Sequence, residues 1–329
     1  MQNASRSSED LGVSRATIAD TYERIKAAIR VTPVIDVAVA DLPVPARLKL
    51  ECLQHTGSFK PRGAFANLIG ADIPAAGVAA ASGGNHGAAV AFAARAIGVP
   101  AHIFVPEQTP PAKIARIKSY GAEIVRAGKS YAGALARSQD FVGRTGALPV
   151  HAYDSLATLN GQGTIGRELE EQAPDLDTVL VAVGGGGLIG GIAAWCRGGP
   201  KVVGVEPETC DALNAALAAG RPVDISPSGY AVDSLGASRV GSLVFPIARQ
   251  AVERVVLISD SDIARAQAWL WSELRLIAEP GGATAFAALL CGAYAPAPGE
   301  RVGIIVCGAN TDFATFPKET PCPPTSSLS

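Results

Sequence analysis

The chain has 329 residues and a mass of 33.5 kDa, and 48% of its residues are hydrophobic. Its 28 basic side chains nearly balance 30 acidic ones, so the net charge of −2 gives no basis for a nucleic-acid or membrane-surface partner. This balance favours a small-molecule partner, on a chain long enough for one large or two modest domains.

Cysteine usage and the ends of the chain bear on cellular location. Six cysteines lie far apart, with no CxxC pair and no histidine at metal-ligand spacing, which fits a reducing, cytoplasmic compartment rather than a zinc site or a disulfide framework. The N-terminus has no apolar signal-peptide segment. Two uncharged stretches, 178–196 and 280–299, are rich in glycine, alanine or proline and are interpreted as core rather than as membrane spans. The first dozen residues and the tail from Pro317 are expected to be disordered.

Short aliphatic runs alternate along the chain with longer, alanine-rich runs that are typical of helices. The expected strands, in chain order, are 47–51, 78–82, 101–105, 178–183, 201–206, 252–259 and 301–307. The expected helices between them include 85–98, 110–120, 131–143, 161–172, 209–219 and 260–277. This alternation, with continuously apolar strands, predicts an α/β fold of parallel sheets covered by helices on both faces.

The first chemically informative segment is GSFKPRGA, residues 57–64, which follows the strand 47–51. Ser58 is expected to be the N-cap of a helix whose first turn holds Pro61. Lys60 then stands at a strand-to-helix junction, where α/β sheets place ligand-facing groups. In a dry pocket, desolvation lowers the pKa of a lysine and lets its amine form an imine with a carbonyl cofactor. The alternative is a solvated lysine beside an N-cap.

The second segment is ASGGNHGAA, residues 81–89, between a strand and a helix. Its glycines let the backbone turn tightly against a flat ligand. Asn85 supplies a neutral donor and acceptor, and His86 is placed to contact a carboxylate. The alternative is an ordinary strand-to-helix turn with Asn85 as the N-cap.

The third segment is VGGGGLIGG, residues 183–191, between a very apolar strand and an alanine-rich helix. Four successive glycines allow several N–H groups to point at one anion, and the helix N-terminus adds partial positive charge, so a phosphate is the natural ligand. The segment also matches the dinucleotide pattern GxGxxG loosely, with Glu206 slightly out of register as the acidic residue. A nicotinamide cofactor therefore stays open as an alternative.

Together the three segments offer an amine for an imine, a turn for a phosphate and an asparagine for an aromatic ring. Pyridoxal phosphate needs all three. At these residues the chain resembles the fold-type II pyridoxal-phosphate enzymes, with the tryptophan synthase β-like fold, and within them the serine/threonine dehydratase (threonine ammonia-lyase) family. The resemblance extends over residues 17–313. It implies two parallel-sheet α/β domains with the cofactor between them, a large one of residues 1–71 and 149–329 and a small one of residues 72–148, without a C-terminal regulatory domain.

The resemblance also implies roles for individual residues. Lys60 would carry the cofactor as a Schiff base and act as catalytic base, and Cys307 would face the pyridine nitrogen as a neutral thiol rather than serve only as a small buried hydrophobe. Glu279, which begins EPGGA, would lie near the ring, cap the helix 281–292, or do both. The other implied cofactor contacts are Phe59, Asn85, Gly184, Gly185, Gly186, Gly187 and Leu188. The implied substrate contacts are Ser82, Gly83, Asn85, His86 and Gly87, with Tyr153 and Ser234 as further pocket-lining candidates.

Three departures from the family pattern bear on the reaction. Racemases of the family carry a serine at the position of Gly83, a proton donor on the face opposite the lysine, so glycine favours elimination over racemisation. Metal-binding members carry two acidic groups where this chain has Glu206 and Ala212, so no metal is expected and Glu206 alone is left as a candidate ligand. The segment 232–241 reads DSLG where the family more often has DGLA, which predicts a different substrate pocket.

These observations predict a pyridoxal-phosphate-dependent ammonia-lyase that dehydrates and deaminates a small 3-hydroxy amino acid, L-threonine or L-serine, to a 2-oxo acid and ammonia. Alternatives on the same fold are a serine racemase, a dehydratase of another 3-hydroxy amino acid such as hydroxyaspartate, and a β-replacing synthase, against which His86 argues. A non-catalytic phosphate-ligand sensor and a nicotinamide dehydrogenase are alternatives from other classes. The expected partner is the amino-acid substrate, and a homodimer is the expected assembly.

Overall fold

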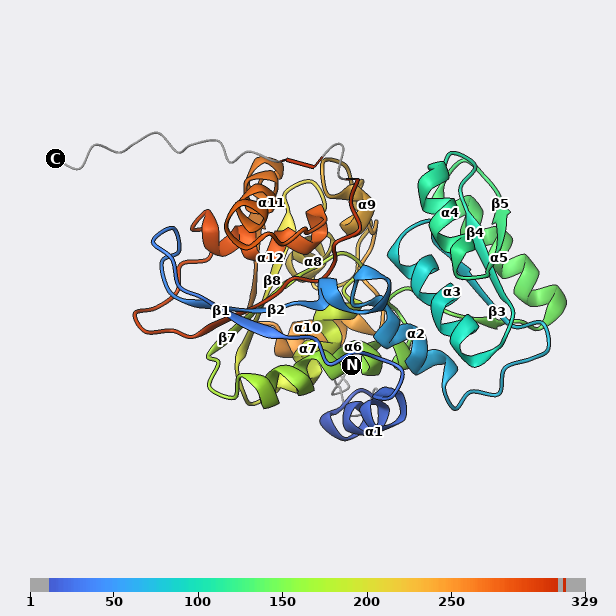
Figure 1. Cartoon of the computed structure of the whole chain (residues 1–329), viewed down its shortest axis with the longest axis horizontal. Helices are drawn as coiled ribbons and strands as arrows, with labels where there is room; N and C mark the ends of the chain where they lie inside the picture. Colours follow the sequence, from blue (N-terminus) through green and yellow to red (C-terminus); the bar gives the residue numbers. More distant parts are fainter. Residues whose placement is uncertain (1–11, 313–315, 318–329) are drawn as a thin grey trace.

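Two α/β lobes of unequal size make up the fold, and Figure 1 shows them side by side. The computed structural model of the chain describes residues 12–312 and 316–317, so the disorder expected of residues 1–11 and 318–329 lies outside the described part. The larger lobe is built on a six-stranded sheet of order β1-β2-β10-β7-β8-β9, and the smaller on a four-stranded sheet of order β5-β4-β3-β6. The strands are β1 (Val34–Val37), β2 (Ala46–Lys49), β3 (Val78–Ala81), β4 (Ala101–Val105), β5 (Glu123–Arg126), β6 (Leu148–Pro149), β7 (Thr178–Ala182), β8 (Lys201–Pro207), β9 (Arg254–Ile258) and β10 (Val302–Ile305).

Helices cover both faces of the large sheet. In Figure 1, α11 and α12 lie above it, and α6, α7 and α10 lie below it. The described α-helices are α1 (Arg15–Ile25), α2 (Lys60–Leu68), α3 (Asn85–Ile97), α4 (Pro111–Ser119), α5 (Tyr131–Thr145), α6 (Leu156–Gln172), α7 (Gly187–Cys196), α8 (Ala212–Ala219), α9 (Val232–Leu235), α10 (Val244–Ala251), α11 (Asp260–Leu274) and α12 (Pro280–Leu290). Two short 3₁₀ helices, η1 (Glu51–Leu53) and η2 (His55–Gly57), connect β2 to α2.

How clearly a strand shows in the sequence depends on whether helices cover both of its faces. The central strands β7 and β10 are buried at every residue, as their continuously apolar sequences predict. All seven expected strands are present, and every pairing between the described strands is parallel except that of β1 with β2. The sequence analysis did not anticipate β1, β5 and β6, which are short strands at sheet edges and have no fully buried run.

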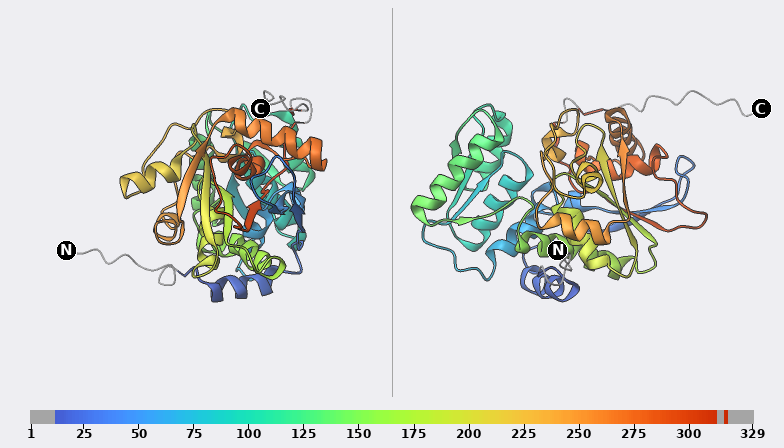
Figure 2. Two further views of the ribbon diagram at one scale, coloured as in Figure 1. Left: turned by 90° about the vertical axis from the view of Figure 1, so that its left-hand side faces the viewer. Right: turned by 180° about the vertical axis from the view of Figure 1, so that it is seen from behind.

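The small lobe is layered in the same way. Val78 and Ala80 of β3 belong to the cluster under α3, whereas Ala79 and Ala81 pack with Phe104 and with α5 on the other face. This alternation matches the two-residue period of a strand whose faces are covered by different helices. Viewed from behind, the small lobe lies to one side of the large sheet and close to α2 (Figure 2). The domain boundaries expected from the sequence stay a prediction, since β6 lies across the second of them.

Three chain segments with functional signals follow the carboxyl ends of parallel strands, two of them in the large sheet and one in the small sheet. The four-glycine segment follows β7, Cys307 follows β10, and the SGGNH turn follows β3. The carboxyl edge of such sheets is where α/β proteins bind ligands. Within the described residues, no helix has the length and apolar character needed to cross a membrane.

Candidate active site

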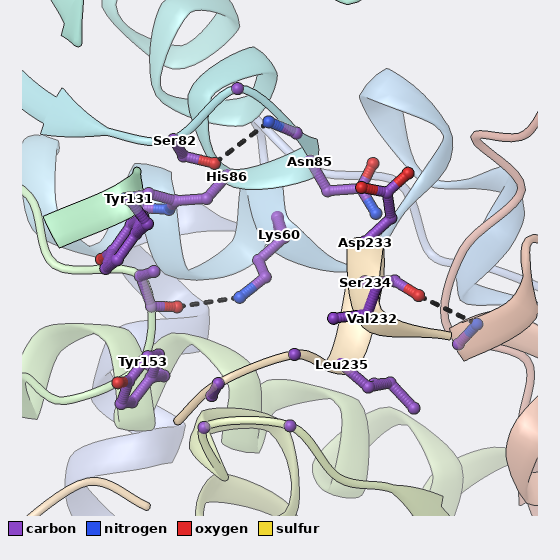
Figure 3. A pocket seen from close by; sticks show the side chains of 18 of the residues that line it. Lys60, Ser82, Asn85, His86, Tyr131, Tyr153, Val232, Asp233, Ser234 and Leu235 are labelled. Atoms are coloured by element: carbon purple, nitrogen blue, oxygen red, sulfur yellow. Dashed lines mark hydrogen bonds between the residues drawn. The ribbon is translucent and has the colours of Figure 1, made fainter. Parts of the chain in front are cut away.

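A cavity of about 690 Å³ is lined by residues of both lobes (Figure 3). Its size is that of a site for a cofactor-sized ligand. Nearly every residue that the sequence analysis assigned to the site lines it, and Gly87 is the exception. The lining residues among them are Phe59, Lys60, Ser82, Gly83, Asn85, His86, Tyr153, Gly184, Gly185, Gly186, Gly187, Leu188, Ser234, Glu279 and Cys307.

Lys60 is the first residue of α2, and its side chain extends into this cavity (Figure 3). Its Nζ donates a hydrogen bond to the backbone carbonyl of Ala152 at 2.9 Å, and its amine lies 5.0 Å from the centre of the Phe59 ring. Burial lowers the pKa of Lys60 to about 8, although Cys307 and Glu279 act in the opposite direction. The amine is therefore far more easily deprotonated than a solvated lysine.

Ser58 is not the N-cap of α2, contrary to the expectation from the sequence. The cap residue is Phe59, in helical conformation and without a capping side-chain hydrogen bond, and the Ser58 hydroxyl is buried with no hydrogen-bond partner among the described residues. The reason is that Ser58 is extended and pairs with Gly308 next to β10. Pro61 does lie in the first turn, as expected.

A buried ionic network fixes α2 in the large lobe. Arg62, two residues after Lys60, donates to Glu51 at 2.8 Å and to Glu168 of α6 at 2.7 Å, and Lys49 of β2 also contacts Glu168 at 2.7 Å. These four side chains are at most 1% exposed. Two positive and two negative charges cancel, so the network satisfies the rule that buried charges must be paired. It holds the start of α2, and with it Lys60, against β2 and α6.

Small residues let α2 approach α6 this closely. A Cβ added at Gly161 of α6 would lie 2.6 Å from the backbone oxygen of Arg62, and one added at Gly63 would lie 2.5 Å from Gln162. From the sequence, a helix was predicted over residues 161–172. The helix in fact starts at Leu156, where the Ser155 side chain caps it by accepting from Thr158.

Asn85 is held in place by hydrogen bonds from two sides. Its Nδ2 donates to Glu279 Oε1 at 2.6 Å, and its Oδ1 accepts from Asn310 Nδ2 at 2.5 Å. Asn310 also donates to the backbone carbonyl of Thr56. Burial raises the pKa of Glu279 to about 7. The amide of Asn85 is thus oriented at the cavity wall, while Glu279 contacts it rather than serving as a side-chain cap of α12.

The four-glycine segment has the shape of a phosphate cradle. Gly186 has a φ of +89°, which only glycine adopts without strain. A Cβ at Gly185 would overlap the Tyr153 ring, and one at Gly187 would lie 2.8 Å from the Tyr153 backbone. No side chain caps the N-terminus of α7, so its first N–H groups stay free of such a partner at the cavity. These residues fit the phosphate of pyridoxal phosphate.

Cys307 is buried at the cavity and its Sγ donates to the carbonyl of Gly281 at 3.3 Å. Burial raises the pKa of this thiol well above its usual range, with a further contribution from Glu279. The group is therefore a neutral thiol, as the resemblance implied, and it does not protonate a pyridine nitrogen in the way a carboxylic acid does.

The SGGNH turn presents backbone and neutral side chains to the cavity. Ser82 Oγ accepts from the N–H of Gly84 at 3.2 Å, and His86 Nε2 lies 2.9 Å from the Val150 carbonyl. Burial, together with the positive charge of Lys60, lowers the pKa of His86 to about 3, so the ring is neutral and brings no charge to a carboxylate. Gly87 lies beneath the turn, where a Cβ would overlap the Ser82 carbonyl.

Thr109 closes the space next to Gly83. A Cβ added at Gly83 would lie 2.8 Å from Thr109 Cγ2 and 3.2 Å from its Oγ1. Thr109 stands in a turn with prolines at 106, 110 and 111, and its N–H bonds to the Pro106 carbonyl at 3.0 Å. Fixed φ angles at the prolines make this backbone stiff. The sequence analysis missed Thr109 because nothing in a Pro-rich turn indicates which wall it will approach.

Both carboxylate oxygens of Glu206 are used in a structural contact with α8. Glu206 is fully buried at the end of β8, and its two oxygens accept from the N–H groups of Leu213 and Asn214, both at 2.8 Å, in the first turn of α8. Burial raises the pKa of Glu206 to about 8 against the effect of these donors. The neighbouring Ala212 has no side-chain oxygen. This pair of positions does not fit a divalent cation.

The structure adds Lys113, Asp233 and Tyr131 to the cavity, and of these only Asp233 lies in a segment, 232–241, that the sequence had already related to the substrate pocket. Lys113 of α4 and Asp233 of α9 form an ion pair of 3.0 Å that connects the two lobes at the cavity. Tyr131, the first residue of α5, lines the cavity from the small lobe. These residues lie on loops or helix starts whose spatial position depends on how the lobes pack. Asn310, which contacts Asn85 without lining the cavity, lies three residues after Cys307 and so was closer to a recognisable signal.

Known proteins of similar sequence and structure share this site-bearing region. The model of a family described as pyridoxal-phosphate dependent enzyme matches residues 25–308. Phenylserine dehydratase of Ralstonia pickettii is 39% identical over 315 residues, 92% of this chain and 94% of that protein. L-threonine ammonia-lyase of Geobacter sulfurreducens is 38% identical over 280 residues, 84% of this chain and 69% of that protein.

Among solved structures, maize serine racemase matches with a TM-score of 0.88 at 33% identity, covering 92% of this chain and 95% of that one. Threonine deaminase isoform 2 from Solanum lycopersicum, in its processed form, matches with a TM-score of 0.85 at 30% identity, covering 91% of this chain and 90% of that one. The fold is accordingly that of the fold-type II enzymes. The chain belongs to the pyridoxal-phosphate dependent enzyme family, as a lyase with pyridoxal 5′-phosphate as its cofactor.

Proposed function

We propose that the enzyme eliminates water from a 3-hydroxy amino acid, L-threonine or L-serine, and releases a 2-oxo acid and ammonia. The observation that carries this proposal is an easily deprotonated lysine amine, at Lys60, facing a cavity that also contains a glycine cradle. The similarity to a threonine ammonia-lyase and a phenylserine dehydratase supports the same reaction class. The phenyl-bearing substrate of the second relative is included among the candidates for this reason.

The residues divide into those that hold the cofactor and those that hold the substrate. Lys60 would bind the cofactor through its amine, the glycines 184–187 and Leu188 would hold its phosphate, and Phe59, Asn85, Glu279 and Cys307 would surround the ring. When bound, pyridoxal phosphate supplies a carbonyl carbon for amines and a ring that takes up negative charge. The turn at Ser82, Gly83, Asn85 and His86 would hold the substrate carboxylate, with Gly87 supporting it from below.

Lys60 is the base of the reaction in this proposal. Once the substrate amine has displaced Lys60 from the cofactor, a proton would pass from the substrate Cα to the freed Lys60 Nζ, which the Ala152 carbonyl orients through the 2.9 Å hydrogen bond. Because burial lowers the pKa of the amine to about 8, a much larger share of it is able to accept this proton near neutral pH than in a solvated lysine. Gly83 brings no acid or base, and His86 is neutral, so these two residues add no second proton donor at the carboxylate turn. This one-sided arrangement favours elimination over racemisation.

Attachment of pyridoxal phosphate to the apoprotein is expected to accelerate as pH rises and to level off above about pH 8. Only the neutral amine attacks a carbonyl. A pKa of about 8 leaves roughly a tenth of the Lys60 amines neutral at pH 7, whereas the ordinary lysine pKa of 10.5 would leave about one in three thousand neutral. The measurement is the rate of the absorbance change on mixing apoprotein with cofactor between pH 6 and 11. Nα-acetyl-lysine in solution serves as the control, and a protein midpoint as high as that control would contradict the lowered pKa.

The reaction is tested with a substrate panel on the holoenzyme. L-threonine, L-serine, L-threo-3-phenylserine and 3-hydroxyaspartate are each incubated with enzyme, and 2-oxo acid and ammonia are measured in parallel. We expect equal amounts of both products from at least one of the first three. Formation of D-serine from L-serine without 2-oxo acid would instead identify a racemase, and no product from any substrate would defeat the proposal.

Assembly, location and domain division belong to the same proposal. We infer a homodimer in the cytoplasm, with the large domain formed by residues 1–71 and 149–329 and the small one by residues 72–148. The five described cysteines are free thiols, which suits a reducing compartment. Two-fold dimers are the most common assembly of soluble enzymes.

A further inference from the structure

Part of the cavity wall is not accounted for by the residues assigned to the cofactor or to the substrate carboxylate. It contains Tyr131 and Tyr153, which we call the tyrosine wall. Figure 3 shows both rings on the side toward which the Lys60 amine points, with the carbonyl that accepts its hydrogen bond between them. Aromatic residues make up only 5% of the chain, so two of them beside the reactive amine call for an explanation.

The two rings come from different parts of the fold. Tyr131 begins α5 in the small lobe, whereas Tyr153 lies between β6 and α6, on the path back into the large lobe. Tyr153 packs on the glycine cradle, and its hydroxyl donates to the carbonyl of Arg239 at 3.4 Å. The ring is therefore fixed. Tyr131 is 46% exposed and leaves its surface open to a ligand.

The tyrosine wall carries no net charge at neutral pH. Each phenol has its pKa raised by burial, and Tyr131 contributes to the rise at Tyr153, so both hydroxyls stay neutral. Lys113 and Asp233 also line the cavity, and their charges neutralise one another across 3.0 Å. Val232, 39% exposed, adds apolar surface on the other side of Lys60 (Figure 3).

We infer that the tyrosine wall selects 3-hydroxy amino acids whose β-carbon bears an aromatic ring. This inference rests on the proposed elimination reaction and names the substrate class that the cavity prefers. With the ring of pyridoxal phosphate held near Asn85 and Cys307, and the carboxylate at the SGGNH turn, the remaining substituent is directed to the tyrosine wall. An aryl group there packs on the exposed face of Tyr131, which a methyl group or hydrogen cannot cover.

The test is the ratio of kcat/KM for L-threo-3-phenylserine to kcat/KM for L-threonine. We expect Tyr131→Ala and Tyr131→Leu to lower this ratio by at least roughly tenfold, and Tyr131→Phe to keep it within about threefold of the wild type. Tyr131→Leu retains bulk, so it tests the aromatic contact even if the alanine variant folds poorly. Tyr230→Ala is the matched control, because Tyr230 is 38% exposed and does not line the cavity, and its ratio should equal that of the wild type.

A second measurement needs no turnover. L-phenylalanine has no β-leaving group, so its dissociation constant from the holoenzyme reports ring binding alone, and L-alanine serves as the reference ligand. The wild type should bind L-phenylalanine more tightly, and Tyr131→Leu should remove most of that preference. An unchanged kcat/KM ratio and an unchanged ligand preference in Tyr131→Leu would overturn the inference. If the wild type turned over none of the panel yet bound L-phenylalanine selectively, the proposed reaction would be wrong, whereas the inferred selection of aromatic groups by the tyrosine wall would be supported.

Discussion

Replacing Lys60 with alanine is expected to lower kcat for 2-oxo acid release by at least about a thousandfold. The variant loses the amine that binds the cofactor covalently and the base that takes the Cα proton, and general-base catalysis alone contributes roughly a hundred- to ten-thousandfold. No other amine is placed to replace it, since the other lysine among the described residues of the cavity, Lys113, is engaged in the ion pair with Asp233. Steady-state kinetics on the best substrate of the panel measure the effect.

Covalent labelling separates this outcome from simple misfolding. After borohydride treatment, the wild type should carry one cofactor on the peptide that contains Lys60, and the variant should carry none there. Lys26→Ala, at an exposed position directly after α1, is the control and should behave as the wild type. Near-normal kcat in Lys60→Ala, or a label on a different lysine, would show that the amine has been assigned to the wrong residue.

Replacing Arg62 with methionine is expected to cost about 3–5 kcal/mol of unfolding free energy. The change leaves Glu51 and Glu168 buried with less positive charge than negative, and breaking a buried pair from one side has this effect because the remaining charge is uncompensated. The measurement is urea-induced unfolding of the apoprotein. Since α2 carries Lys60, we also expect weaker cofactor binding in this variant.

Arg265→Met provides the comparison for that experiment. Arg265 forms an ion pair with Asp262 on the exposed side of α11, where a pair is worth at most about 1 kcal/mol. If both arginine variants lost the same small amount of stability, the buried network would not be what holds α2. A large loss in Arg62→Met alone, with a wild-type pH optimum for the residual activity, supports a role in positioning rather than in chemistry.

The sequence was sufficient for the central strands and the ligand-facing junctions. β7 and β10 are buried on both faces, so their apolar runs are unambiguous, and the segments that follow parallel strands must meet at one edge of the sheet. This logic places Lys60, the glycine cradle and Cys307 at one edge of the large sheet, whereas Asn85 follows β3 of the small sheet and reaches the cavity through the packing of the two lobes. Family resemblance supplied their individual roles.

The sequence did not predict the features whose positions depend on tertiary contacts. Short edge strands such as β1 and β5 bury too little to show a pattern, and Ser58 was misassigned because its pairing partner, Gly308, lies far away in the chain. The tyrosine wall forms only when the start of α5 in the small lobe approaches the segment between β6 and α6. The buried network likewise joins residues separated by more than a hundred positions, which no local pattern encodes.

The stiff turn around Thr109 has a consequence for how this enzyme can be changed. Because Thr109 already fills the volume next to Gly83, substitutions at the two positions are not independent. A side chain at position 83 requires the Thr109 side chain to move or to be made smaller, so its effect depends on the residue at position 109. A library that varies both positions together is therefore expected to recover side chains at position 83 that are poorly tolerated as single substitutions.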